Sequence, residues 1–265
     1  MNVEATRTEI GEKIAKHSRF VLQFSGGKDS LCVLHLLKPW WNRLIVVWGD
    51  PGDGYEEERE RVAKECAGVA EFRVANGHAK EWQAKALPSD IVPARSTAIG
   101  IQLQPESGAV PLVSRHECCA ANMWVPIMRE THATGASLII RGQRTTEQFR
   151  NNIASGTQDI SGAEIYFPIR DWTQAEVLQF LKDEGVQLPK YYEYVDGSLY
   201  CKHCTAYQDT MRGKLAYLSD FHPQAAREYE RRMEIVRREI SIALNTFIEG
   251  VKEIGNPVKN PLVKK

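Results

Sequence analysis

Hydrophobic residues along the chain gather in short runs that polar, charged segments separate. Runs rich in branched or aromatic residues predict buried strands over residues 20–24, 44–48 and 137–140, with a further candidate over 71–74. Spaced apolar positions predict helices over residues 31–37, 55–66, 124–132 and 173–184, and a long charged helix over 220–254. The alternation of strands and helices predicts an α/β fold, a doubly wound and mostly parallel sheet with helices on both faces.

Capping residues and prolines between these runs indicate where helices begin and where loops lie. Thr173 and Glu176 form a capping-box pattern that opens one of the helices. Residues 83–116 contain four prolines and no clear periodicity, so we expect long loops around a site there. We predict one domain over residues 1–215 and a helical C-terminal extension over 216–265.

The junction between the strand at 20–24 and the following helix contains two glycines, a lysine and two serines. Backbone N–H groups and the positive end of the helix dipole meet at such a point, and phosphate or sulfate binds there readily. The glycines allow close backbone approach, the lysine adds a charge and the hydroxyls add donors. The alternative is an ordinary turn with a good N-cap. We predict that the whole hexapeptide binds phosphate: Ser25, Gly26, Gly27, Lys28, Asp29 and Ser30.

Two more polar groups follow predicted strands. In doubly wound sheets ligands bind beyond the carboxyl ends of the strands. Asp50 follows the second strand and is, with Lys28, a candidate catalytic residue, although it could equally be a turn residue. After the strand at 137–140, arginine side chains offer planar forks suited to phosphate or sulfate, and a solvated loop is the alternative. The candidates there are Arg141, Gly142, Arg144 and Arg150.

Four of the six cysteines form two close pairs. Cys118 and Cys119 are adjacent, and Cys201 and Cys204 form a C-x-x-C pattern. Two pairs suit a site with four thiolate ligands. The adjacent pair is unusual for zinc and less unusual for a [4Fe–4S] cluster, so we favour the cluster, with zinc as the runner-up and unligated thiols third. Cys32 and Cys66 lie among apolar helix positions and are expected to be packing residues.

Composition excludes several classes of protein. Lys plus Arg and Asp plus Glu balance at 34 each, so no general attraction to nucleic acid is expected. No apolar stretch reaches the roughly 20 residues that span a bilayer, so we expect no membrane segment. The first 16 residues are polar and charged, unlike a signal peptide, and clustered cysteines without such a signal suggest a reducing compartment. We therefore predict a cytoplasmic protein.

The ordered motifs resemble a known family. The hexapeptide resembles the SGGxDS signature of the PP-loop ATP pyrophosphatase superfamily, which has an adenine-nucleotide α-hydrolase-like fold. The order of that signature, Cys-Cys with an apolar helix, Gly-x-Arg, Pro168 to Trp172 and C-x-x-C is similar to the sulfonucleotide (PAPS and APS) reductases, over about residues 18–210. The resemblance implies binding of ATP, APS or PAPS, with Mg²⁺ in the case of ATP, and a [4Fe–4S] cluster on the four paired cysteines.

The chain departs from those reductases where they carry their nucleophile. Their catalytic cysteine lies near the C-terminus, whereas no cysteine follows Cys204 in these 265 residues. Release of sulfite needs such a thiolate. We therefore prefer an ATP pyrophosphatase that adenylylates an acceptor for sulfur transfer, as relatives do in DNA phosphorothioation and tRNA thiolation. The alternatives are an APS or PAPS reductase whose thiol comes from elsewhere, and a non-catalytic nucleotide-sensing subunit.

The preferred reaction needs a sulfur donor, and the resemblance suggests a cysteine desulfurase; the reductase alternative needs a thioredoxin-like reductant. A basic stretch of the long helix could dock nucleic acid or an acidic protein, although a solvated helix face explains it better. Its arginines are Arg227, Arg231, Arg232, Arg237 and Arg238.

Overall fold

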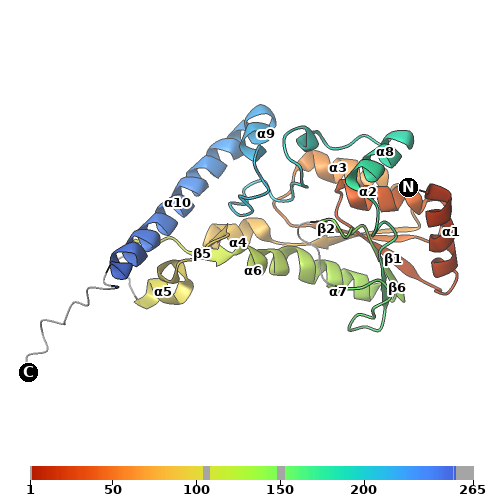
Figure 1. Cartoon of the computed structure of the whole chain (residues 1–265), viewed down its shortest axis with the longest axis horizontal. Helices are drawn as coiled ribbons and strands as arrows, with labels where there is room; N and C mark the ends of the chain where they lie inside the picture. Colours follow the sequence, from red (N-terminus) through yellow and green to blue (C-terminus); the bar gives the residue numbers. More distant parts are fainter. Residues whose placement is uncertain (1, 104–107, 148–152, 253, 255–265) are drawn as a thin grey trace, which may run out of the picture.

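A five-stranded parallel sheet organises the larger part of the molecule, and the C-terminal helix extends away from it (Figure 1). The computed structural model describes residues 2–103, 108–147, 153–252 and 254. The strands lie in the order β3-β2-β1-β6-β7. They are β1 (Phe20–Phe24), β2 (Ile45–Asp50), β3 (Glu71–Asn76), β6 (Leu138–Arg141) and β7 (Glu164–Tyr166). The doubly wound parallel sheet is therefore confirmed, and the short strand β7 is an addition to the four predicted strands.

The strand order places the topological switch point between β1 and β6. From β1 the chain moves outward through β2 to β3, and it then returns to the other side of β1 with β6 and β7. The register pairs Gln23 of β1 with Arg141 of β6, so both strands end at the same edge. In open α/β sheets ligands bind outside the carboxyl ends of the strands at this kind of switch point.

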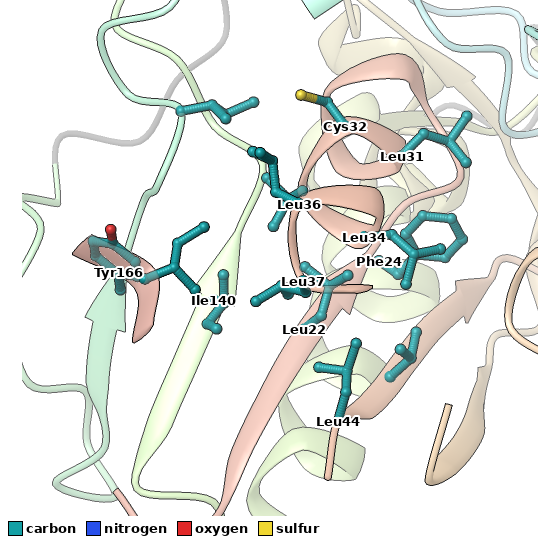
Figure 2. Close-up of a cluster of buried hydrophobic side chains, with 14 of the residues drawn as sticks. Leu22, Phe24, Leu31, Cys32, Leu34, Leu36, Leu37, Leu44, Ile140 and Tyr166 are labelled. Atoms are coloured by element: carbon teal, nitrogen blue, oxygen red, sulfur yellow. The ribbon is translucent and has the colours of Figure 1, made fainter. Parts of the chain in front are cut away.

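Four helices cover one face of the sheet, and their apolar side chains form the main core, part of which Figure 2 shows. Phe20, Leu22 and Phe24 point to this face because alternate residues of a strand share a face. They pack against Leu31 and Leu34 of the following helix. The helices are α1 (Val3–Ile14), α2 (Lys28–Leu36), α3 (Glu56–Glu65) and α8 (Gln174–Asp183), and the short 3₁₀ helix η1 (Lys38–Trp40) follows α2. The capping box predicted at Thr173 is present.

Helix α7 (Val125–Ala133) covers the opposite face, as predicted for residues 124–132. Its Ile127 packs against Val21, Val47 and Ile139, the strand residues that point away from the main core. A five-residue π-helical segment, η4 (Ala120–Trp124), leads into α7. Single π-turns of this kind occur frequently at functional sites.

The expectation of long loops over residues 83–116 is wrong for much of that segment. Short elements occupy it, and β4 and β5 form a separate two-stranded parallel sheet. Leu87 and Leu112 of these strands pack against Val236 of the C-terminal helix. Strands of three residues are too short to give a periodic signal. The elements here are α4 (Ala79–Lys85), β4 (Leu87–Ser89), η2 (Ala94–Ser96), α5 (Ala98–Leu103), β5 (Leu112–Ser114) and α6 (Arg115–Cys119).

The long helix predicted over residues 220–254 is present, and a second, unpredicted helix precedes it. They are α9 (Lys214–Phe221) and α10 (Pro223–Val251), and the 3₁₀ helix η5 (Lys190–Glu193) precedes them. Pro223 occupies the first turn of α10, where its missing N–H costs nothing. Tyr217 and Tyr229 pack against Tyr55 of the N-terminal part, so the extension shares a core with it. The division at residue 215 stays a prediction. Within the described residues, every helix is too short or too polar to cross a membrane.

Candidate active site

The predicted phosphate-binding hexapeptide, called here the SGGKDS loop (residues 25–30), connects β1 to α2 at the switch point. Gly26 has a φ of +81°, which an L-residue with a side chain rarely adopts. Gly27 is the N-cap of α2 and makes no side-chain cap hydrogen bond. The Ser25 and Ser30 hydroxyls lie 3.0 Å apart, and Ser30 Oγ donates to the Gly27 carbonyl at 2.9 Å. The loop therefore presents the N-terminus of α2 in a conformation that its own side chains hold.

Arg144 reaches this loop from the end of β6. Its Nε lies 2.5 Å from Asp29 Oδ1, and the other carboxylate oxygen, Oδ2, accepts from Lys28 Nζ at 3.0 Å. A Cβ on Gly142 would lie 2.7 Å from backbone atoms of Asp29 and Ser30, so only glycine permits this approach. The structure thus brings the predicted Gly142 and Arg144, from the end of β6, to the predicted loop at the end of β1.

The charges at this point are largely buried. Lys28 is 8 % exposed and Arg144 is 4 % exposed. Glu147 Oε1 accepts from the Arg144 backbone N–H at 3.1 Å, and burial raises the pKa of this carboxyl. Lys28 and Arg144 therefore share one fully charged carboxylate, that of Asp29, because burial favours the neutral form of Glu147. Two positive charges beside one negative charge favour binding of an added anion.

Two residues that the sequence patterns did not indicate contact the loop. The Lys28 backbone N–H donates to the Tyr192 hydroxyl at 2.9 Å, and that hydroxyl lies 2.9 Å from Ser198 Oγ. The Tyr200 hydroxyl interacts with those of Ser25 and Ser198, and burial raises its pKa to about 12. A pocket beside the loop is lined in part by Trp48, Tyr55, Leu199 and Tyr200. No sequence motif marks the segment at 190–200, which only the tertiary fold brings to the loop.

Asp50 lies at the end of β2, and its carboxylate is engaged within the protein. Oδ1 accepts from the Gly52 N–H at 2.9 Å, as a turn residue would, and Oδ2 lies 2.7 Å from Arg59 Nε. Asp50 is 5 % exposed, whereas the Arg59 side chain is about half exposed. Its catalytic role stays a prediction.

Arg141 ends β6, but its guanidinium contacts the opposite side of the sheet from α2. Its Nη2 lies 3.4 Å from Met128 Sδ of α7. Its Nε is buried without a hydrogen-bond partner, and burial lowers the pKa of Arg141. Its part in phosphate binding stays a prediction, and Arg150 lies outside the described residues.

The four paired cysteines, called here the cysteine site, lie around one cavity. Cys118, Cys119, Cys201 and Cys204 line it together with Arg115 and Asn122. All six cysteines of the chain carry free thiols. Among the described residues, no three or more His, Cys, Asp or Glu side chains converge closely enough to hold a metal ion. The four thiols therefore line a space without converging on one point. Around a single zinc ion they would converge, because Zn–S bonds of about 2.3 Å keep the sulfur atoms about 3.8 Å apart.

The sulfur atoms of the cysteine site lie beside hydrogen-bond donors. Asn122 Nδ2, in the π-helical segment, lies 3.8 Å from Cys118 Sγ, and the Tyr207 hydroxyl lies 3.3 Å from Cys119 Sγ. Tyr207 is the single non-glycine residue with positive φ (64°) in the described part of the chain. Its backbone N–H donates to Asp90 at 2.9 Å, and the Arg115 guanidinium lies 4.6 Å from its ring centre. Such strain persists only where the surroundings enforce it, often at functional sites.

A buried lysine supports the C-x-x-C turn. Lys214 is 2 % exposed, and its Nζ donates to the carbonyls of Cys201 at 3.1 Å and Cys204 at 2.8 Å. Asp53 holds the same turn, because its carboxylate accepts from the His203 backbone N–H at 3.0 Å. Burial raises the pKa of all four thiols of the site, so they favour the neutral form until a cation compensates the thiolate charge.

Cys32 and Cys66 are packing residues, as expected. They are 0 % and 3 % exposed, and Figure 2 shows Cys32 among the buried side chains of α2. Burial raises the pKa of Cys32 far above its ordinary range and that of Cys66 to about 12. Neither thiol is available as a nucleophile in this conformation.

Comparison with known proteins shows which folds the chain resembles. No curated protein sequence matches the chain significantly. Among solved structures, the chain is similar to phosphoadenylyl-sulfate (PAPS) reductase from Candida auris in complex with phosphate, at 12 % identity and a TM-score of 0.50, over 71 % of this chain and 83 % of that one. It also aligns with NH3-dependent NAD synthetase from Campylobacter jejuni in complex with a nitrate ion, at 18 % identity and a TM-score of 0.46, over 88 % of this chain and 92 % of that one.

A family model supplies the assignment. The model of the phosphoadenosine phosphosulfate reductase domain matches residues 19–207, which contain the SGGKDS loop, Arg144 and the whole cysteine site. Since the match spans well over half of the chain, the chain belongs to the phosphoadenosine phosphosulfate reductase domain family.

Proposed function

We propose that the chain is a PP-loop ATP pyrophosphatase that activates an acceptor by adenylylation for sulfur transfer. ATP, with Mg²⁺, would place its phosphates at the SGGKDS loop. An acceptor oxygen attacks the α-phosphorus, the bond from that phosphorus to the bridging oxygen breaks, and pyrophosphate leaves. The amides at the α2 N-terminus and the Lys28 ammonium stabilise the charge that builds up on pyrophosphate.

The other predicted residues support this reaction from nearby. Arg144 is fixed through Asp29, so its charge is preorganised beside the loop. Asp50 is the second catalytic candidate, at the next strand end, where it would have to exchange its contact with Arg59 for one with the nucleotide.

One observation favours this reaction over reduction of a sulfonucleotide: among the described residues, no thiol outside the cysteine site is accessible. Cys32 and Cys66 are buried, and the other four cysteines of the chain line a single cavity. Reductase chemistry needs a thiolate that attacks sulfur and forms an S-sulfo intermediate. The family assignment supports a reductase as the second candidate, in which case a thioredoxin-like partner would supply the thiol.

We propose further that the cysteine site holds a [4Fe–4S] cluster. Four thiols line one cavity, hydrogen-bond donors lie near Sγ of Cys118 and Cys119, and Lys214 holds the C-x-x-C turn. This arrangement suits a large anionic cluster better than a single zinc ion. Four cysteine ligands would leave no open iron to carry sulfur, so the cluster would supply charge and structural support. Sulfur would arrive as a persulfide on a partner such as a cysteine desulfurase. Its terminal sulfur would displace AMP from the acceptor, and a thiol reductant would then cleave the resulting disulfide and leave the sulfur on the acceptor.

The acceptor is proposed to be a nucleic acid, as in DNA phosphorothioation or tRNA thiolation. The arginines of α10 are a weak argument for it, because four of the five lie beside a carboxylate on the same helix. Arg231 and Arg232 pair with Glu228, Arg237 with Glu234, and Arg238 with Glu239. The third candidate, a nucleotide sensor, predicts binding without turnover.

Parallel incubations separate the three functions. Anaerobically purified protein is given ATP with candidate acceptors, or APS or PAPS, and pyrophosphate and protein mass are followed. We expect pyrophosphate from ATP in the presence of the right acceptor, and binding of APS or PAPS without a covalent adduct. A stoichiometric S-sulfo adduct on Cys32 or Cys66, with sulfite released by thioredoxin, would restore the reductase. Tight ATP binding without pyrophosphate with any acceptor would favour the sensor.

A further inference from the structure

The segment at residues 190–200 lies over the SGGKDS loop and takes up one of its anion-binding groups. The Lys28 N–H is the first backbone donor of α2, and it donates to the Tyr192 hydroxyl at 2.9 Å. The first N–H groups of a helix have no partner within the helix, and these are the groups that bind anions. Tyr192 therefore accepts a hydrogen bond that a phosphate oxygen would otherwise take.

The two hydroxyls lie close against the backbone of the loop. A Cβ added to Gly27 would lie 2.2 Å from Ser198 Oγ and 3.2 Å from the Tyr192 hydroxyl. Lys28 Nζ also lies 5.7 Å from the centre of the Tyr192 ring. Because one N–H donates well to one acceptor at a time, Tyr192 and a phosphate oxygen cannot both hold the Lys28 amide.

We propose that Tyr192 and Ser198 form a latch on the SGGKDS loop that the phosphates of a bound nucleotide displace. The latch rests on the proposed function, since it needs a nucleotide at this loop. In the nucleotide-free protein the two hydroxyls satisfy the amide and hold the segment down. Binding transfers the amide to a phosphate oxygen and frees the segment.

The freed segment leads directly into the cysteine site. Tyr200, whose hydroxyl interacts with Ser198 and Ser25, immediately precedes Cys201. Lys214 Nζ donates to the carbonyls of Cys201 and Cys204 and so holds the C-x-x-C turn in place. Movement of the segment would therefore strain the start of this turn. The proposal therefore links nucleotide binding to the cysteine site, and by linkage a change at either site would alter binding at the other.

Variants that lack the latch hydroxyls test the proposal, because it predicts tighter nucleotide binding when they are removed. In calorimetric titrations with Mg-ATP, Tyr192→Phe is expected to bind about 3- to 10-fold more tightly than wild type, since the nucleotide no longer competes with that hydrogen bond. Ser198→Ala should give a smaller gain in the same direction. Tyr194→Phe is the matched control, because the Tyr194 hydroxyl donates to Asp220 on α9 and not to the loop. Unchanged or weaker binding in both latch variants would overturn the proposal.

Two further measurements separate the latch from the proposed function. Inorganic pyrophosphate is titrated beside ATP, because it needs only the anion site; tighter pyrophosphate binding by Tyr192→Phe supports the latch even if ATP is not the substrate. Hydrogen–deuterium exchange over residues 190–200 should become faster when wild type binds ATP or pyrophosphate, and should change little in Tyr192→Phe. Slower exchange on binding would mean that the hydroxyls hold the ligand themselves, which contradicts the latch.

Discussion

Arg144 Nε lies 2.5 Å from Asp29 Oδ1, although 115 positions separate the two residues in sequence. The contact joins the end of β6 to the first turn of α2, across the point where the strand order reverses. Asp29 also accepts from Lys28, so a single carboxylate positions both cations of the candidate phosphate site.

Replacement of Arg144 by Ala should weaken both the site and the fold. Asp29 would then be paired with Lys28 alone, which draws the ammonium away from the anion. We expect the free energy of unfolding to fall by about 1.5–3 kcal/mol, as for loss of a charged hydrogen bond, and Mg-ATP affinity to fall about tenfold. Chemical denaturation and calorimetry measure the two effects. Arg129→Ala, at an exposed position on α7, is the control. Unchanged ATP affinity in Arg144→Ala would limit Arg144 to a structural role.

Loss of the Lys28 charge should weaken binding more directly. A charge-assisted hydrogen bond contributes about 1.5–3 kcal/mol, so Lys28→Ala should bind adenine nucleotide roughly 10- to 150-fold more weakly. Gly27→Val should also weaken binding, because its side chain would stand where the phosphates must approach the loop backbone. Lys64→Ala, exposed on α3, should leave the affinity unchanged. Wild-type affinity in both loop variants would place the nucleotide elsewhere.

The cysteine site should carry iron. Protein purified without oxygen is expected to be brown, with broad absorption near about 400 nm, as thiolate-ligated clusters are. Serine at any one of the four positions should lower the iron content measured by metal analysis. Cys32→Ser should keep it, since that thiol lies in the main core. Stoichiometric zinc without iron in the wild-type protein would contradict the cluster and show that the site binds zinc.

The Tyr207 hydroxyl should tune the proposed cluster. Its distance of 3.3 Å to Cys119 Sγ allows a donated hydrogen bond, and such bonds stabilise the more negative, reduced state. Tyr207→Phe should therefore keep its iron but show a lower reduction potential in a spectroelectrochemical titration. Tyr194→Phe serves as the control for loss of a tyrosine hydroxyl. An unchanged potential in Tyr207→Phe would show that this hydroxyl does not act on the cluster.

Local sequence patterns predict most of the strands and helices of the main sheet. The apolar runs of β1, β2 and β6 and the capping box of α8 are contiguous signals, so their strands and helix could be placed before any tertiary structure was known. Strand β7 and the small sheet of β4 and β5 were missed. Their strands have three residues each and depend on pairing with distant partners, and so they give no periodic signal.

The sequence by itself determined the residue types of the site, because the SGGKDS loop and the two cysteine pairs are short segments whose chemistry depends on neighbours in the chain. Only the tertiary structure decided which distant groups meet. It placed Arg144 on Asp29 and turned Arg141 towards α7, since successive side chains near a strand end point to different faces. It also brought the Tyr192 hydroxyl to the Lys28 backbone N–H, 164 positions away in the sequence. These contacts arise from packing between elements far apart in the chain, and packing of that kind leaves no mark on local sequence.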